Sequence, residues 1–98
     1  MSRQLILKPD AELDLKQAYR WYEEQRSGLG QEFLEQTEVT LERIRLNPKS
    51  GSPTHRECRL ALTRRFPYVI CYLFDDAAIY VVAIYHGHRD PSIWRERL

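Results

Sequence analysis

The stretch YVICYLFDDAAIYVVAIY, residues 68–85, decides the fold of this 98-residue chain. It contains two apolar runs, Tyr68 to Phe74 and Ile79 to Tyr85, separated by Asp75 and Asp76. β-Branched and aromatic residues favour strands, and the turn-forming residues fall between the runs rather than inside them. The pattern therefore predicts two long antiparallel strands. Because both are apolar on both faces, we expect them to lie centrally or to be covered on both sides.

Cationic and imidazole side chains flank this pair of strands. Arg65 precedes the first strand, whereas His86, His88 and Arg89 follow the second. In an antiparallel pair, the start of one strand lies beside the end of the next. We therefore expect these side chains at one edge of the sheet, where a single small site could use them all.

The upstream sequence predicts a strand followed by a helical hairpin. Residues 3–8 form a short apolar run that ends at Pro9, and Asp10 is a good N-cap for a helix. Two stripes with helical spacing follow, separated by the breaker at residues 27–30. The first stripe consists of Ala11, Leu15, Ala18 and Tyr22, and the second of Phe33, Leu34, Thr37, Leu41 and Ile44. The second helix should stop at Asn47-Pro48.

A half-buried strand is predicted after a loop at residues 49–55. Cys58, Leu60 and Leu62 alternate with Glu57, Arg59 and Ala61, so the first set should face inward and the second outward. The element order β-α-α-β-β-β then describes one α+β domain over residues 1–98. A helical hairpin would pack on a small antiparallel sheet, with a short C-terminal helix near Trp94. Apolar surface left on the second sheet face would mark a protein interface.

Composition favours a soluble cytoplasmic protein. Hydrophobic residues make up 43% of the chain and charged residues 30%, and the formal net charge is +1. The N-terminal apolar run is too short for a signal peptide, and no stretch approaches the ~20 apolar residues of a membrane span. We therefore expect a cytoplasmic location and no membrane partner. Cys58 and Cys71 are interpreted as buried thiols rather than a disulfide.

Basic residues gather locally although the chain is nearly neutral. Arg56, Arg59, Arg64 and Arg65 stand against a single acid, Glu57. The cluster is either a solvated strand face or a phosphate-binding patch. With Arg89, the residues Arg59, Arg64 and Arg65 are the candidates for binding phosphate or a target.

No metal or cofactor is predicted. His86-x-His88 has a spacing that could place two ligands on one strand face, and Cys58 or Cys71 could add a thiolate. However, His88 follows Gly87 into a turn, and the cysteines have the pattern of core residues.

Several short motifs, in order, carry a resemblance to a known family. They are Asp14-Leu15 and Tyr22 on the first helix, Asn47-Pro48 after the second, Arg65-Phe66-Pro67-Tyr68, and Ile84-x-His86-x-x-Arg89-Asp90-Pro91-x-x-Trp94. Together with the element order, they resemble the RelE/ParE superfamily of bacterial type II toxins over nearly the whole chain. The resemblance implies a toxin held inactive by a cognate antitoxin in a hetero-oligomer. It leaves the activity open, because the superfamily contains both RNA-cleaving enzymes and inhibitors of DNA gyrase.

RNA cleavage, with mRNA and the ribosome as partners, needs a base, an acid and a cation at the phosphate. Glu57 could be the base, Arg65 the phosphate clamp, and His86 or His88 the acid. This set resembles the Glu, Arg, His arrangement of the YoeB branch. The chain lacks the Lys and Arg cluster with a late Tyr that marks the RelE branch.

Gyrase inhibition needs only a binding surface. The C-terminal segment Ser92 to Leu98 could supply it, with Trp94, Arg95 and Arg97 at the target interface. Phe66-Pro67-Tyr68 and the ending from His86 to Pro91 are more similar to ParE-type members, so the ParE-like activity is favoured. A third alternative is a non-toxic member that acts only together with its antitoxin.

Overall fold

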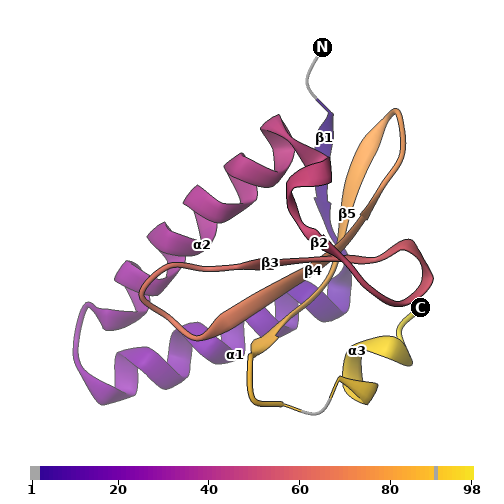
Figure 1. Ribbon diagram of the computed structural model, residues 1–98. Coiled ribbons are helices and arrows are strands. Elements are labelled where there is room, and N and C mark those ends of the chain that lie inside the picture. Colours follow the sequence, from indigo (N-terminus) through magenta and orange to yellow (C-terminus); the bar gives the residue numbers. More distant parts are fainter. Residues whose placement is uncertain (1–2, 90) are drawn as a thin grey trace.

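A computed structural model describes residues 3–89 and 91–98, and it has two long helices packed on a five-stranded sheet (Figure 1). The strands are β1 (Gln4–Leu7), β2 (Ser52–Pro53), β3 (Arg59–Leu62), β4 (Tyr68–Phe74) and β5 (Ala78–His86). The α-helices are α1 (Pro9–Gln25), α2 (Leu29–Leu46) and α3 (Ser92–Arg95), and two single 3-10 turns are η1 (Pro48–Ser50) and η2 (His55–Glu57). The predicted α+β class, helical hairpin and long strand pair are confirmed.

The sheet has the order β1-β5-β4-β3-β2 and is mixed rather than wholly antiparallel. β1 runs parallel to β5, with Gln4 beside Ala78 and Leu7 beside Val81. The prediction of a purely antiparallel sheet was wrong at this edge, because a pairing between the two ends of a chain leaves no local sequence signal. β2 is a further difference, since it forms a two-residue pairing with β3 inside the segment predicted to be a loop.

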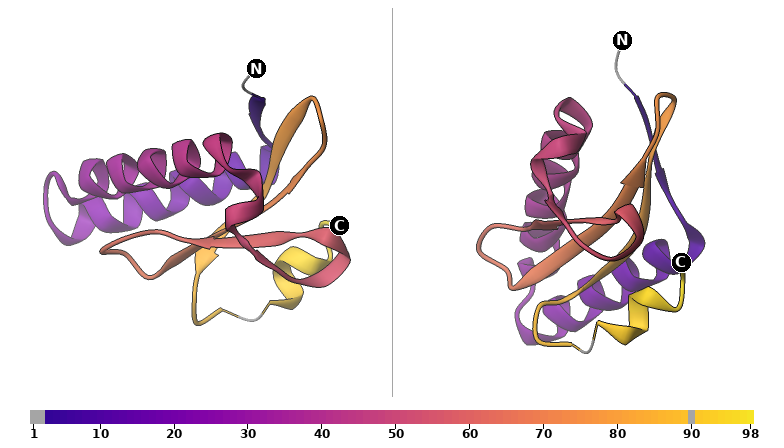
Figure 2. Two further views of the ribbon diagram at one scale, coloured as in Figure 1. Left: turned by 45° about the horizontal axis from the view of Figure 1, so that its top comes forward. Right: turned by 45° about the vertical axis from the view of Figure 1, so that its right-hand side comes forward.

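The helical hairpin is held by the turn that joins its two helices. Gly28 adopts φ 90°, a left-handed conformation that favours glycine, and starts α2. Its backbone N–H and that of Gly30 both donate to the Glu23 carboxylate at 2.9 Å, which satisfies donors that the start of a helix leaves free. α1 and α2 therefore lie side by side on one side of the strands, while α3 lies on the other side (Figure 2).

Side chains from both faces of β4 and β5 are buried, which explains why these strands are apolar throughout. Ile70 and Tyr72 of β4 face the two long helices, whereas Cys71 faces Trp94 of α3. A β-bulge opposite Cys71 and Tyr72 changes the alternation of β5, because Cys71 pairs with Ala83 and Tyr72 with Val81. The expected cover on the second face is thus supplied by the chain's own C-terminal helix.

β3 differs from the predicted inward and outward sets. Cys58 is buried as predicted, but Ala61 is also buried, against the helices, and the Leu62 side chain is 69% exposed. The alternation was interpreted as one buried and one solvated face. Both faces of this strand contact other elements, so alternation alone could not identify the buried side chains.

Candidate functional site

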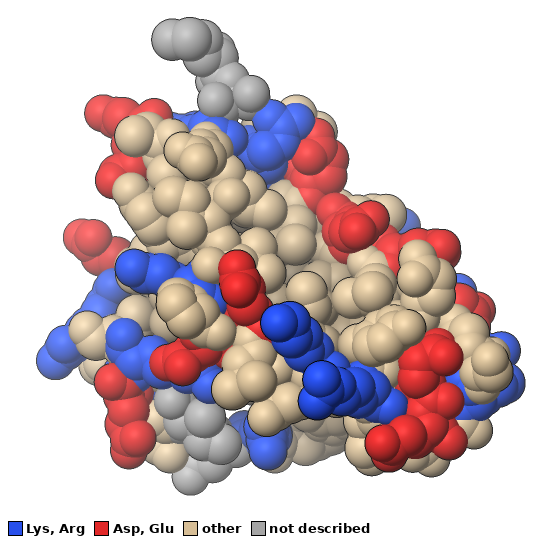
Figure 3. Space-filling model, turned by 180° about the vertical axis from the view of Figure 1, so that it is seen from behind, with Lys and Arg blue, Asp and Glu red and all other residues tan. Residues whose placement is uncertain are grey.

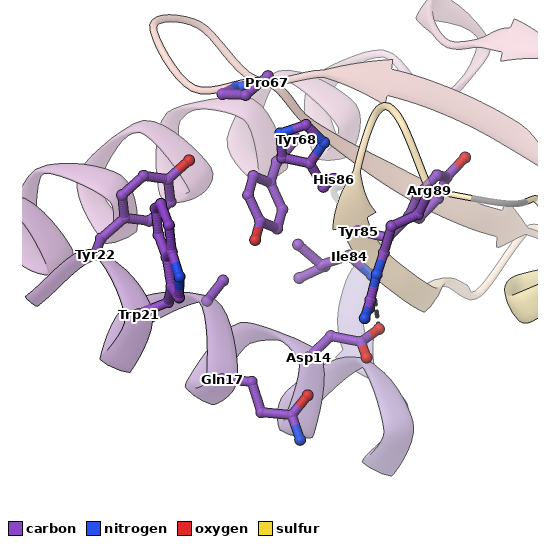
Figure 4. A pocket seen from close by; sticks show the side chains of 11 residues that line it. Asp14, Gln17, Trp21, Tyr22, Pro67, Tyr68, Ile84, Tyr85, His86 and Arg89 are labelled. Atoms are coloured by element: carbon purple, nitrogen blue, oxygen red, sulfur yellow. Dashed lines mark hydrogen bonds between the residues drawn. The ribbon is translucent and has the colours of Figure 1, made fainter. Parts of the chain in front are cut away.

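A pocket of about 490 Å³ lies where α1 passes the ends of β4 and β5. Figure 4 shows side chains from α1 and from the two strands facing one another across it. Its polar side chains come from both sides. The lining comprises Asp14, Gln17, Ala18, Trp21, Tyr22, Pro67, Tyr68, Ile84, Tyr85, His86 and Arg89.

The pocket exists because β5 is longer than its neighbour β1. β1 pairs only with residues 78–81, so the outer edge of β5 beyond Val81 has no strand beside it. Asp14 accepts a hydrogen bond from the Ile84 N–H at 3.0 Å, and Arg97 donates to the Val82 carbonyl at 3.1 Å. Two side chains therefore replace the missing strand along part of this edge.

Asp14 and Arg97 also bind each other directly. Nη1 of Arg97 lies 2.6 Å from Oδ2 of Asp14, and Nη2 lies 3.0 Å from Oδ1, which makes a bidentate pair. Both side chains are largely shielded from solvent, with 12% of the Asp14 and 20% of the Arg97 side chain exposed. Hydrogen bonding to Asp14 raises the pKa of Arg97. The pair fixes the C-terminal segment to α1 at the floor of the pocket.

Aromatic rings form the opposite wall. The rings of Tyr22 and Tyr68 lie 6.0 Å apart, and Trp21, which packs edge-on against Tyr22, is 55% exposed. Burial raises the pKa of Tyr68, an effect that Arg89 partly offsets and Asp14 reinforces. Burial likewise raises the pKa of Tyr22. Both hydroxyls are therefore protonated at neutral pH, and the wall offers apolar ring faces with hydrogen-bonding groups at their edges.

Two imidazoles lie at the rim. His86 is opposite Tyr68 in the sheet register, at the predicted edge of the sheet, and the two rings are 5.6 Å apart. Nδ1 of His86 accepts a hydrogen bond from the His88 backbone N–H at 3.1 Å, so the neutral ring carries its proton on Nε2. The His86 and His88 rings are 5.2 Å apart. The Arg89 side chain points toward Asp14 across the pocket (Figure 4).

Arg64 and Arg65 lie in the exposed turn between β3 and β4, outside the pocket lining. Arg65 adopts φ 70° and forms an ion pair with Glu32 of α2 at 3.2 Å. Its guanidinium also lies over the Phe66 ring. Arg65, the predicted phosphate clamp, is thus at the expected end of the sheet, but the Glu32 carboxylate already neutralises part of its charge.

Glu57 is far from the other proposed catalytic residues. It is the last residue of η2 at the opposite end of the sheet, since Arg59, two residues further on, pairs with Tyr72 whereas His86 pairs with Tyr68. At ~3.3 Å per residue, Arg59 already lies roughly 13 Å along the strands from the position of His86. The structure does not bring the predicted base, clamp and acid together.

Arg59 makes contacts within the fold. Its Nη1 donates to the carbonyls of Lys49 at 3.0 Å and Gly51 at 2.7 Å. These bonds tie β3 to the η1 turn. Because they use one nitrogen of the guanidinium, the binding of phosphate or a target by Arg59 stays a prediction.

Two of the three C-terminal residues proposed as a target interface make their contacts within the molecule. Trp94 is only 1% exposed and packs with Cys58, Cys71 and Ala83, and Arg97 is paired with Asp14. Only Arg95 of the three projects outward, with its guanidinium over the Trp94 ring. An interface made by Trp94 and Arg97 would require α3 to leave the sheet. Asp90 of the C-terminal motif lies outside the described residues.

Sequence reasoning did not select Asp14, Trp21 or Tyr68 as site residues. The sequence did contain a hint of the role of Asp14. This residue is next to Leu15 on the apolar face of the first helix, and a carboxylate that is buried there needs a polar partner. The partner, Arg97, lies 83 residues away, so the sequence could not identify it. Tyr68 was assigned only to a strand.

Within residues 3–89 and 91–98, no cluster of three or more His, Cys, Asp or Glu could hold a metal ion. In the same part of the chain, no helix has the length and apolarity to cross a membrane. On the face of the molecule that α1 occupies, basic and acidic side chains are interspersed rather than gathered into one basic surface (Figure 3).

Known proteins resemble this chain in sequence and in fold. The family described as "ParE toxin of type II toxin-antitoxin system, parDE" matches residues 5–91. The chain belongs to the ParE toxin family. A solved structure titled "Chromosomal ParDE TA system from P. aeruginosa" has a similar fold, with a TM-score of 0.73 and 15% sequence identity. The match covers 86% of this chain and 95% of that one. No curated protein sequence matches the chain.

The resemblance to this family predicted from the sequence is therefore confirmed. The protein is a ParE-family toxin of a type II toxin-antitoxin system, and membership of a ParDE family implies an antitoxin partner.

Proposed function

We propose that this ParE-family toxin inhibits DNA gyrase by binding it and that its cognate antitoxin neutralises it by occupying the pocket beside α1. The observation that supports the proposal is the position of Glu57, which most of the sheet separates from Arg65 and His86, so the predicted acid, base and phosphate clamp do not form one site. A binding toxin needs no such assembly. It needs exposed side chains, and those of Arg89 and Arg95 are exposed.

The pocket suits an antitoxin segment better than a nucleotide. Its aromatic wall of Trp21, Tyr22 and Tyr68 offers apolar surface, and an exposed Trp is a typical interface residue. Asp14 and Arg89 give the pocket one acidic and one basic group, which suits a peptide more than a polyanion. A helix laid into a groove is a common way to fill such a surface.

A DNA supercoiling assay with purified gyrase tests the proposed activity. The folded protein, freed of antitoxin, should block supercoiling of relaxed plasmid or leave linear DNA, and antitoxin should reverse the effect. Arg89→Ala and Arg95→Ala should weaken inhibition at least tenfold, whereas Lys49→Ala, at an exposed position away from the pocket, should not. Unimpaired gyrase in the presence of folded wild-type protein would refute the proposal.

Antitoxin binding is tested separately by titration. Trp21→Ala should weaken antitoxin affinity by about 2 kcal/mol, as expected for an exposed aromatic anchor, while Arg20→Ala, an exposed neighbour outside the pocket lining, should change it little. Equal affinities for wild type and Trp21→Ala would place the antitoxin on another surface.

Cleavage of mRNA on the ribosome is the second candidate, favoured by the His86 and His88 rings, which lie 5.2 Å apart beside Arg89. Two imidazoles could act as base and acid without Glu57. In that case His86→Gln and His88→Gln should each abolish cleavage, and Glu57→Gln should leave it intact. Intact mRNA in a translating extract that contains the folded toxin would exclude this candidate. A chain inactive in both assays would be a non-toxic member that acts only with its antitoxin.

A further inference from the structure

Two cysteines lie in contact beneath the C-terminal helix. Cys58 directly precedes β3, and Cys71 lies on β4 opposite Leu60. Their Sγ atoms are 2.7 Å apart, which is only about 0.65 Å longer than a disulfide bond. Both thiols are free and fully buried. Since they lie on adjacent strands of a rigid sheet, closing the bond needs only a small side-chain adjustment.

The two thiols are not chemically equivalent. The contact with Cys71 lowers the pKa of Cys58, and the Arg59 backbone N–H lowers it further, although burial opposes both effects. The contact with Cys58 and burial raise the pKa of Cys71. The lowered pKa favours Cys58 as the thiol that reacts with an oxidant.

The C-terminal helix controls access to this pair. Trp94 packs directly on the cysteines together with Ala83, and its ring stacks against Tyr85 with centroids 6.3 Å apart. The buried Nε1 of Trp94 has no hydrogen bond of good geometry to a described residue, although interaction with the indole lowers the pKa of Tyr85, which burial raises. A buried donor without a good acceptor weakens the packing of α3. The bidentate contact of Arg97 with Asp14 opposes its release.

We propose that Cys58 and Cys71 form a redox-active dithiol that a peroxide converts to an intramolecular disulfide when α3 moves away from the sheet. The Cys58 thiolate attacks one peroxide oxygen, the O–O bond breaks, and the hydroxide that leaves takes up a proton as water. The Cys71 sulfur then attacks the sulfenic acid on Cys58 and releases the second water. Two thiols are oxidised and one peroxide is reduced, so the step balances.

The bond would join β3 to β4 across the turn that carries Arg64 and Arg65. In a reducing compartment the pair stays as thiols, and such disulfides form transiently when oxidant rises. Oxidation would thus stiffen one hairpin of the toxin without a change in the pocket lining, since neither cysteine contributes to it.

Peroxide treatment of the reduced, folded protein tests the proposal. We expect an intact mass lower by two hydrogen atoms, loss of both free thiols after unfolding, and a monomer on a non-reducing gel. Cys58→Ser and Cys71→Ser should each prevent the mass loss. Arg97→Ala, which frees α3 from Asp14, should speed the reaction severalfold, whereas Arg45→Ala, which breaks the ion pair with Glu42 elsewhere, should not.

A second measurement does not depend on the folding of any variant. Wild-type protein equilibrated in a mixture of reduced and oxidised glutathione should reach the same intramolecular disulfide more slowly. Persistence of both thiols in either experiment, or oxidation of one cysteine alone to sulfinic acid, would overturn the proposal. A rate that is equal in wild type and a folded Arg97→Ala would overturn the role of α3. None of these readouts involves gyrase, so they are independent of the proposed toxin activity.

Discussion

At the residue scale, the Tyr72 hydroxyl is a polar group placed inside the main core. It donates to the Pro48 carbonyl at 2.7 Å and accepts from the Gly51 N–H at 2.9 Å. Tyr72 itself is fully buried. A single side chain therefore anchors the η1 turn, which carries the chain from α2 into the sheet.

Tyr72→Phe should lower the free energy of unfolding by about 1–3 kcal/mol, because it leaves the buried Gly51 N–H and Pro48 carbonyl without this partner. Urea denaturation followed by circular dichroism measures the change. Tyr80→Phe is the matched control, since the Tyr80 hydroxyl makes only one 3.3 Å contact, to an exposed carboxylate. Equal losses in both variants would contradict the anchoring role.

Some features of the site could be predicted from the sequence, whereas the roles of other single residues could not. The apolar runs of β4 and β5 predicted their pairing, and this pairing places His86 at the same edge of the sheet as the β3–β4 turn that carries Arg65, as expected. The roles of Asp14 and Arg97 were not predictable, because each depends on a partner at the other end of the chain. Glu57 was assigned to the same site as Arg65 from the chemistry of RNA cleavage and from a resemblance to the YoeB branch, but the length of the strands between them keeps the two residues apart.

At the element scale, the two long helices are in close contact at Gly30. A Cβ atom there would lie 2.6 Å from Glu23 Cγ and 2.7 Å from the Tyr19 carbonyl oxygen. Neither distance is compatible with normal packing. The start of α2 thus crosses the end of α1 without room for a side chain at this position.

Gly30→Ala should destabilise the protein by about 1–3 kcal/mol through overpacking, although alanine alone favours a helix by about 1 kcal/mol over glycine. The midpoint of urea unfolding measures the net effect. Gln31→Ala, at the exposed next position, should leave the midpoint unchanged or raise it slightly. A Gly30→Ala variant more stable than wild type would show that the helices separate at little cost.

Glu32 links three elements, since it binds Arg26 at the hairpin turn and Arg65 in the β3–β4 turn. These hydrogen bonds, with Arg26 contributing most, lower the pKa of Glu32 below its ordinary value of 4.5. The stabilisation is therefore complete above pH 4.5 and is lost as the pH falls through the lowered pKa of the folded state.

Glu32→Gln should reduce the melting temperature at pH 7, and the difference from wild type should disappear at strongly acidic pH. Thermal unfolding across this range measures the difference. Glu35→Gln, at an exposed position on the same helix, should follow wild type at every pH. A Glu32→Gln deficit that persists when the carboxyl is protonated would mean that charge is not its source.

At the scale of the whole molecule, the sheet separates two apolar clusters of unequal size. The larger one lies under α1 and α2, and the smaller one joins Cys58, Cys71 and Ala83 to Trp94. The sequence left open whether a helix or a partner chain covers the second face of the sheet. A four-residue helix supplies that cover, so the tail that is a candidate for target binding is also part of the core.

This double role decides how the tail should be tested. Trp94→Ala should lower the free energy of unfolding by about 3–5 kcal/mol, because it empties the centre of the smaller cluster. Arg95→Ala should change it by about 0.5 kcal/mol or less, since its side chain is exposed and only overlies the Trp94 ring.

A chain truncated before Pro91 loses both residues, so its failure to inhibit gyrase would not separate folding from target contact. Unfolding curves recorded beside the supercoiling assay make that separation. Full stability with weakened inhibition in Arg95→Ala would assign the tail a direct contact, whereas full stability in Trp94→Ala would contradict a structural role for α3.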